Sequence, residues 1–166
     1  MASKISKIVP NLWFATQAEE AARFYTSVFP NSSLGKITRY GKAGYDIHGM
    51  AEGTVMTVEF TLDGQEFLAL NGGPVFTFSE AISFIINCDT QEEADYFWDM
   101  LTEGGDLNAQ QCGWLKDKFG VSWQVIPIEF NEMMDDPDPE KSERMMEAML
   151  QMKKLDVAAL KRAYEG

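Results

Sequence analysis

The sequence has little of the chemistry that a catalytic metal site or a nucleic-acid surface requires. Its 166 residues include one histidine and two cysteines, and the spacings HxH, HExxH and CxxC do not occur. Because a catalytic metal needs about three converging ligands, we expect no bound metal. The 26 acidic residues outnumber the 14 basic ones, for a net charge of −12. This excess disfavours a nucleic-acid partner, because phosphate contacts need clustered lysine and arginine.

Long apolar runs and nucleotide motifs are missing too. No run approaches the roughly 20 residues that a membrane span needs, and no apolar segment follows the basic N-terminus, so we expect neither a membrane contact nor a signal peptide. Neither G-x-G-x-x-G nor a P-loop occurs, and we expect no cofactor. Two cysteines, Cys88 and Cys112, without a secretory signal indicate free thiols in a reducing compartment. A cytoplasmic location is the resulting expectation.

The first half of the chain predicts a strand, a helix and three further strands. Thr16 and Glu19 have the spacing of a capping box, and Pro30 ends the helix that follows. Asp63-Gly64 is a two-residue hairpin signal. The expected strands are 8–14, 33–40, 54–62 and 66–70, with a glycine-rich loop at 41–53.

The second half repeats this order. Thr90 and Glu93 form a second capping box, and the helix ends at Gly104-Gly105. The expected strands are 81–88, 107–111 and the two arms of a hairpin within 112–127. We therefore predict an α+β protein of two βαβββ modules, at about 5–72 and 80–128, that form a curved mixed sheet with the helices outside. Together they make up a predicted domain, 1–128.

The second arm of the last hairpin matters most for function. Its turn, Asp117–Gly120, carries an aspartate and a glycine where a tight reversal needs them. Because strand side chains alternate, Trp123 and Val125 share one face, and Ser122, Gln124 and Ile126 share the other. One face of this strand therefore presents a single amide, that of Gln124.

Residues 129–166 predict a helical C-terminal extension. Helices are expected at 139–152 and 156–164, the latter capped by Asp156. The apolar positions of the first are rich in methionine: Met145, Met146, Met149, Leu150 and Met152. This stripe is more typical of a helix that packs on a core, and an adaptable partner surface is the alternative.

Few side chains are candidates for catalysis or binding. Cys112 is either a thiolate nucleophile or a small buried hydrophobe. His48, in the glycine-rich loop, is either a general base, a residue that covers a pocket with its loop, or a solvated histidine. Glu59 is the only carboxylate on the polar face of a well-defined strand. Trp13 and Trp114 line an apolar ligand pocket or belong to the core.

Four segments together resemble a known superfamily. They are LWF…AEEAARFYTSVFPNS, VMTVEFTLDGQEFLALNGGP, EAISFIINCDTQEEADYFW and CGWLKDKFGVSWQVIP, which cover nearly all of residues 8–127. The chain resembles the glyoxalase/bleomycin-resistance/extradiol-dioxygenase (vicinal oxygen chelate) superfamily. It is more closely similar to the PhnB-like subgroup, often labelled 3-demethylubiquinone-9 3-methyltransferase, and the tail from Asn131 is similar to that subgroup as well.

This resemblance places four metal-ligand positions and implies a homodimer. The positions fall near Pro10 or Asn11, near Ala69 or Leu70, at Ser83 and at Gln124, where the usual histidines and glutamates are missing. The resemblance therefore implies a metal-free cup. Its expected ligand-binding residues are Ser83, Gln124, Glu59, Trp13 and Trp114, and the catalytic candidates are Glu59, Gln124, His48 and Cys112.

The expected function is the binding of a small, partly apolar metabolite in this cup. One alternative is a lyase, isomerase or 3-demethylubiquinone-type methyltransferase, although the chain has no glycine-rich strand–turn–helix for S-adenosylmethionine. A second alternative is a resistance protein that sequesters a drug.

Overall fold

The structure is a computed structural model that describes residues 6–166, and the chain divides into two units, residues 1–77 and 78–166. Each unit contains one mixed sheet and a helix that covers it, and the second unit continues into C-terminal helices. The predicted α+β class is confirmed. The first residue of the first predicted module, residue 5, lies outside the described residues. The predicted boundary between a 1–128 domain and a 129–166 extension stays a prediction.

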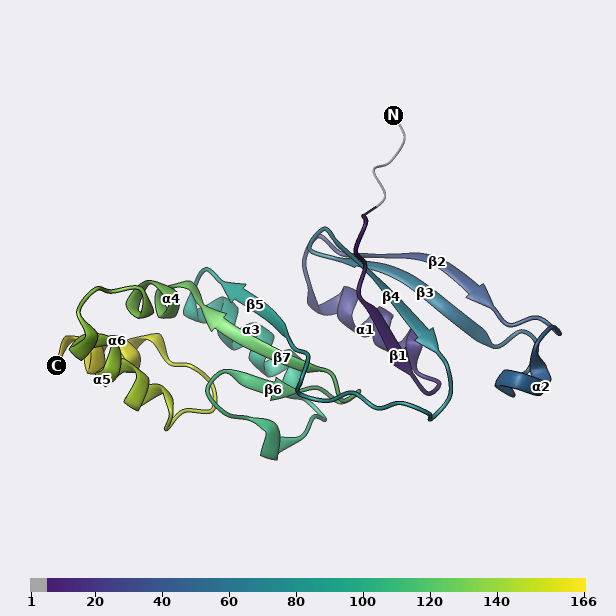
Figure 1. Cartoon of the computed structure of the whole chain (residues 1–166). Coiled ribbons are helices and arrows are strands. Elements are labelled where there is room, and N and C mark those ends of the chain that lie inside the picture. Colours follow the sequence, from purple (N-terminus) through teal and green to yellow (C-terminus); the bar gives the residue numbers. More distant parts are fainter. Residues whose placement is uncertain (1–5) are drawn as a thin grey trace. The chain divides into compact units, whose positions relative to one another are not determined.

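Unit 1 is a four-stranded sheet with one long helix (Figure 1). Its strand order is β1-β4-β3-β2, with β1 parallel to β4 and the other pairs antiparallel. Its elements are β1 (Asn11–Phe14), α1 (Ala18–Val28), β2 (Ser33–Arg39), α2 (Tyr45–His48), β3 (Val55–Leu62) and β4 (Gln65–Asn71). The short helix α2 lies within the segment predicted as a loop.

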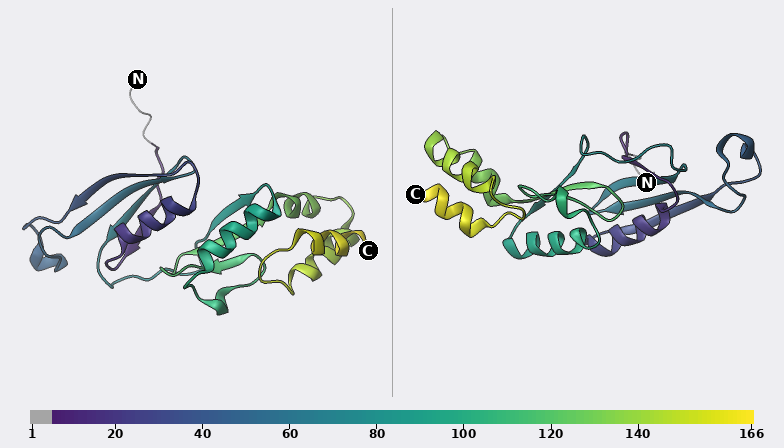
Figure 2. Two further views of the ribbon diagram at one scale, coloured as in Figure 1. Left: turned by 180° about the vertical axis from the view of Figure 1, so that it is seen from behind. Right: turned by 90° about the horizontal axis from the view of Figure 1, so that it is seen from below.

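The core of unit 1 lies between α1 and one face of the sheet (Figure 2). Val58, Phe60 and Leu62 of β3 are buried on this face, as their alternation predicts. The ring of Phe60 stacks on Tyr25 of α1, with centroids 6.3 Å apart. The opposite face of β3 carries Glu59 and is the open face of this sheet.

Helix α1 begins differently from the prediction. The structure shows no side-chain cap from its N-cap residue, Gln17. Instead Asn71, at the end of β4, accepts a hydrogen bond from the backbone N–H of Ala18 at 2.8 Å through its Oδ1. The predicted Thr16–Glu19 capping box is therefore wrong, because a buried asparagine from a distant strand accepts from a first-turn N–H that has no partner within the helix.

Unit 2 has a three-stranded sheet in the order β5-β7-β6, with β5 parallel and β6 antiparallel to the central β7. Helix α3 covers one face of it (Figure 2). The elements are β5 (Phe84–Cys88), α3 (Gln91–Thr102), the 3₁₀-helix η1 (Leu107–Ala109), β6 (Trp114–Lys116), β7 (Ser122–Pro127), α4 (Ile128–Met134), α5 (Pro139–Met149) and α6 (Val157–Glu165).

The predicted strand at 107–111 is wrong. The segment instead begins with η1, because the carboxylate of Asp106 accepts a hydrogen bond from the N–H of Asn108 at 2.9 Å and caps a helical turn. Only Gln111 keeps a strand-like interaction, as an isolated bridge to Trp114. The second cap is confirmed: Thr90 accepts a hydrogen bond from the N–H of Glu93 at 3.1 Å.

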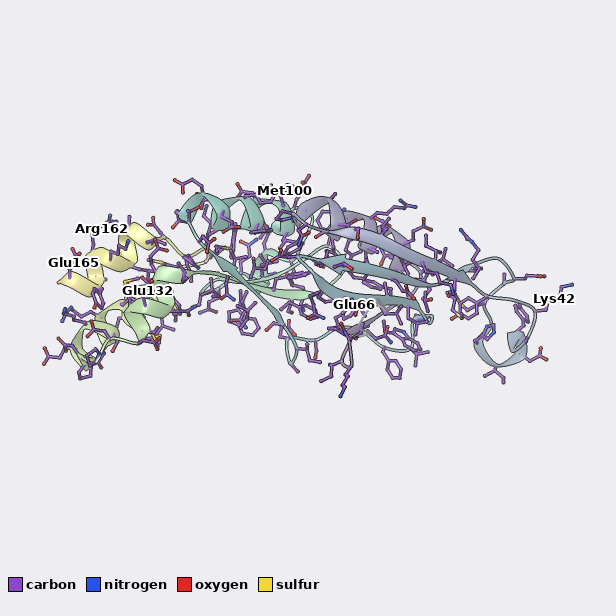
Figure 3. The ribbon with its side chains drawn as sticks, turned by 90° about the horizontal axis from the view of Figure 1, so that it is seen from above. Lys42, Glu66, Met100, Glu132, Arg162 and Glu165 are labelled. Atoms are coloured by element: carbon purple, nitrogen blue, oxygen red, sulfur yellow. The ribbon has the colours of Figure 1, made fainter. Side chains whose placement is uncertain are left out.

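The C-terminal helices pack on the end of β7 (Figure 1). Ile126 joins a buried cluster with Met133, Met145, Leu155 and Leu160. Part of the predicted methionine-rich stripe therefore docks on a core, with Met149 and Met152 packed against the cluster, whereas Leu150 is exposed. Glu132 lies on α4, and Arg162 and Glu165 lie on α6 (Figure 3). None of the helices among the described residues is long and apolar enough to cross a membrane.

Candidate functional site

The open face of the second sheet centres on Gln124. Trp123 and Val125 of β7 are buried on the α3 side, so Gln124 points to the opposite face. Its direct neighbours there are Ile85 on β5 and Trp114 on β6, each paired with Gln124 across the sheet. Ile85 is 58% exposed. The amide of Gln124 therefore lies between an aliphatic and an indole side chain.

Gln124 is bonded to Ser83, the residue before β5. Its Nε2 donates a hydrogen bond to the Ser83 hydroxyl at 2.9 Å, and the pair is half-buried. Within residues 6–166 no group donates to Oε1 of Gln124. The serine hydroxyl, which accepts from Gln124, keeps its own proton to donate. Together the two residues offer the Oε1 acceptor and two donors, the Ser83 hydroxyl and the second N–H of Gln124, to a neutral polar group.

Both ends of this face are closed along β7. Ser122, two residues before Gln124, is 2% exposed. Its hydroxyl is a buried oxygen without a hydrogen-bond partner among the described groups. Ile126, two residues after Gln124, is covered by the C-terminal helices. Gln124 is thus the accessible polar residue in the middle of the strand.

A hollow of about 390 Å³ adjoins this face. It is lined by Trp114 together with Glu80, Ala109, Gln111 and Cys112. Glu80 forms an ion pair with Lys116 of β6. The hydrogen bond from the Lys116 ammonium lowers the pKa of the Glu80 carboxyl group. Trp114 borders both Gln124 and the hollow, so it is the residue that the two have in common.

Cys112 lies in the turn that enters β6. Its thiol donates to the carbonyl oxygen of Met149 at 3.5 Å, and its φ of 52° is in the left-handed region. The thiol therefore faces a backbone carbonyl and not a general base. The other cysteine, Cys88, is fully buried, and burial raises the pKa of its thiol to about 12. Neighbouring Glu93 and Asp89 charges add to that increase.

In unit 1, Trp13 and Glu59 share the open face of the four-stranded sheet. The indole Nε1 of Trp13 donates to the carbonyl oxygen of Gly73 at 2.9 Å, and its ring meets Phe76 edge-on at 5.0 Å. The ring fills the space above Gly72, where an added Cβ would lie 2.1 Å from it. Glu59 is exposed and has no hydrogen-bond or ion-pair partner among the described residues.

His48 is held within its own loop. Its Nδ1 accepts a hydrogen bond from the N–H of Met50 at 3.0 Å, so Nε2 carries the proton that goes to the carbonyl oxygen of Ala43 at 3.1 Å. The ring also packs on Tyr40, with centroids 4.6 Å apart. Both nitrogens are therefore engaged with backbone groups, which leaves neither one free to take a substrate proton.

The four positions implied for a metal do not fit one. Ser83 and Gln124 bond to each other as neutral groups. Leu70 and Ala69 are apolar, and Asn11 is a single exposed amide on β1. Over residues 6–166 no group of three or more histidine, cysteine, aspartate or glutamate side chains is placed to hold a metal ion. Ser83 and Gln124 therefore have the chemistry of a hydrogen-bonding pair.

The structure brings some predicted site residues together and adds others. Ser83, Gln124, Trp114 and Cys112 gather on one side of unit 2, whereas Trp13, Glu59 and His48 belong to unit 1. Sequence reasoning missed Ile85 as a neighbour of Gln124, although the alternation of β5 places it on that face. It also missed Gln91, whose partners lie 64 and 66 residues further along the chain.

Comparison with protein families gives one match over most of the chain. The model of a family described as 3-demethylubiquinone-9 3-methyltransferase matches residues 6–126. Among curated proteins, nothing matches the chain.

Solved structures give further matches. A Bacillus cereus protein, whose description names it a PhnB protein and proposes a 3-demethylubiquinone-9 3-methyltransferase, is 39% identical with a TM-score of 0.64, over 74% of this chain and 99% of that one. Protein PA1353 from Pseudomonas aeruginosa is 22% identical with a TM-score of 0.58, over 74% and 98%. A glyoxylase/bleomycin resistance protein/dioxygenase domain from Frankia sp. EAN1pec is 14% identical with a TM-score of 0.44, over 75% and 93%.

Proposed function

Because this chain belongs to the 3-demethylubiquinone-9 3-methyltransferase (PhnB-like) family, we propose that it binds a small, partly apolar metabolite on the open face around Gln124. The predicted PhnB-like relationship is confirmed. The ligand, the homodimer and the cytoplasmic location are proposals. The resemblance to the superfamily supports the homodimer, and the two free cysteines suit a reducing compartment such as the cytoplasm.

One observation carries the proposal. Gln124 and Ser83 are bonded at 2.9 Å, and Gln124 has Ile85 and Trp114 on its two sides. Small-molecule sites combine apolar walls with a few polar groups that fix orientation. The open acceptor of Gln124 and the proton of Ser83 suit a hydroxyl or carbonyl group, and the indole and isoleucine suit a ring.

These features favour a neutral ring with oxygen substituents. Gln124 and Ser83 carry no charge, and the adjacent Lys116 is already paired with Glu80. A phenol or quinol has the required donor, acceptor and apolar surface in one small molecule. The description of the related Bacillus cereus protein, which refers to a demethylubiquinone, supports this class.

The test uses methoxyhydroquinone as a small quinol probe. Binding is followed by the side-chain amide signals of Gln124 and the indole N–H signals in ¹H–¹⁵N spectra of the full chain. We expect saturable shifts at Gln124 and Trp114. Gln124→Ala and Ser83→Ala should each weaken binding about fivefold, the effect of one hydrogen bond. Gln17→Ala, which removes an exposed amide of unit 1, is the matched control and should leave affinity unchanged.

Two outcomes would overturn the proposal. The first is the absence of saturable shifts in the natural protein, and the second is binding that Gln124→Ala leaves unchanged. Conversion of the quinol in the same sample would favour the rival enzyme hypothesis, in which Gln124 acts on a substrate.

A further inference from the structure

We infer that the C-terminal helices form one end of this site. We also infer that Gln91 is the positioning residue, because its hydrogen bonds hold these helices in place. The helices close one end of the Gln124 face and hold the turn at Gln111–Gly113, which lines the hollow. The role in ligand binding rests on the proposed function, whereas the hold on the turn is independent of it.

The helices lie beyond the residues that the family model matches. The family match ends at residue 126, and the helices occupy Ile128–Glu165. Ile126 belongs to the same face as Gln124 and is 7% exposed, because Met133, Met145, Leu155 and Leu160 cover it. A ligand at Gln124 would therefore meet this C-terminal segment at one end of the face.

The turn before β6 depends on the C-terminal segment for two hydrogen bonds. The backbone N–H of Cys112 donates to the carbonyl oxygen of Met152 at 2.8 Å, and the backbone N–H of Gly113 donates to the carbonyl oxygen of Lys153 at 2.7 Å. Cys112 has a φ of 52° and Gly113 one of 84°. A left-handed cysteine persists only where its surroundings hold it, and these two carbonyl groups provide that hold.

The packing at this point is tight. A Cβ added to Gly113 would lie 3.2 Å from the Cδ1 of Leu155. Leu155 is 1% exposed and belongs to the buried cluster. The position of the turn, and with it that of Cys112 and Trp114 in the hollow, therefore follows the position of residues 152–155.

Gln91 holds the same short segment from the other side. This first residue of α3 donates through Nε2 to the carbonyl oxygen of Leu155 at 3.1 Å and accepts through Oε1 from the N–H of Val157 at 2.8 Å. Lys154 adds an ion pair to Asp95 of α3 at 2.6 Å. Residues 152–157 are thus held between α3 and the turn. Loss of the Gln91 hydrogen bonds should therefore also make the turn that lines the hollow more mobile.

The first experiment measures the reactivity of Cys112 with dithionitrobenzoate in the full chain. Gln91→Ala should raise the rate about tenfold, because two hydrogen bonds that restrain local opening are lost. Gln17→Ala is the matched control, since Gln17 occupies the corresponding place before α1 and its side chain caps nothing. An unchanged rate in Gln91→Ala would overturn the inference.

Cys88 separates positioning from a general loss of stability. It is buried in the core of the same unit, so it reacts when the unit opens as a whole. In a Cys112→Ser background, Gln91→Ala should leave the rate of Cys88 within about twofold. A tenfold rise at Cys88 as well would mean that Gln91 only stabilises the fold, and would overturn the positioning role.

The methoxyhydroquinone titration then tests the link to binding. If the natural protein binds the quinol, Gln91→Ala should weaken it severalfold and Gln17→Ala should not. Unchanged affinity alongside faster Cys112 modification would overturn the part in binding. If the natural protein does not bind the quinol, the proposed function fails, and the two thiol rates still decide the positioning role.

Discussion

The same two residues, threonine and glutamine, stand around the start of both long sheet-covering helices, but the two helix starts are held by different means. Thr16-Gln17 precedes α1, and Thr90-Gln91 stands at the start of α3. Thr90 caps its own helix, whereas Asn71 from a distant strand replaces Thr16. Gln17 is exposed, whereas Gln91 binds the C-terminal segment. A local pattern therefore sets where a helix starts, and the elements that pack against it decide what each side chain does.

The two hairpin turns differ in the same way. Asp63-Gly64 joins β3 to β4 as an exposed turn with φ angles of 45° and 82°. Asp117 opens the turn between β6 and β7 and is 3% exposed. Its carboxylate accepts hydrogen bonds from the N–H groups of Phe119 and Val121 and from the indole of Trp123 at 2.8 Å. The first aspartate shapes backbone alone, and the second also joins the turn to the core.

The largest expected effect is at the buried turn. Asp117→Ala should lower the free energy of unfolding by about 4 kcal/mol, because it leaves buried N–H donors, including that of Trp123, without an acceptor. Asp63→Ala should cost about 1 kcal/mol, the penalty of a left-handed alanine. Urea unfolding followed by circular dichroism measures both. Equal losses would contradict the difference between the two turns.

The next effect concerns the cap of α1. Asn71 is 3% exposed, and its amide also donates to the carbonyl oxygen of Val55 at 3.1 Å. Asn71→Ala should cost about 3 kcal/mol in urea unfolding, since a buried N–H and a part-buried carbonyl group lose their partner. Thr16→Ala is the comparison and should change little. A larger loss from Thr16→Ala would restore the capping box predicted from the sequence.

The cap of α3 should have a smaller effect. Thr90→Ala removes the acceptor for the N–H of Glu93 and should cost about 1 kcal/mol. The difference between Thr90→Ala and Thr16→Ala, measured under the same denaturing conditions, reports how the two helix starts differ. Equal losses in the free energy of unfolding would contradict the statement that Thr90 caps its helix and Thr16 does not.

The smallest effect is the pH dependence of the link between α3 and the C-terminal segment. The hydrogen bond from Lys154, and then that from Gln91, lowers the pKa of the Asp95 carboxyl group. Stability from this group is present above the unfolded pKa of about 3.9 and is lost as the pH falls through the lower folded value. Because Asp95 is 41% exposed, the gain is about 0.5 kcal/mol or less. Asp95→Asn should remove it at pH 7 and make no difference at about pH 2, as urea midpoints would show.

Much of the fold was readable from the sequence because it depends on local periodicity. The alternation of β3 placed Val58, Phe60 and Leu62 on the buried face, and Asp63-Gly64 marked its hairpin. The strand predicted at 107–111 failed because one local hydrogen bond at Asp106 competes with sheet pairing. Apolar residues there did not reveal which interaction would prevail.

The candidate site was only partly readable. Alternation put Gln124 on the face opposite Trp123, but its pairing with Ser83 depends on the register of β5 against β7. The role of Gln91 depends on helices more than 60 residues away. No local pattern specifies such a partner, because it is set by how distant elements pack.

The absence of a side chain at Gly72 also determines where the Trp13 indole can lie. The Trp13 indole occupies the volume that a Cβ there would need, so a single methyl group would act as a wedge beneath the ring. The displaced indole would lose the carbonyl group of Gly73 and turn toward water. Its fluorescence would shift to the red, and this one glycine therefore fixes the optical environment of a tryptophan elsewhere in the chain.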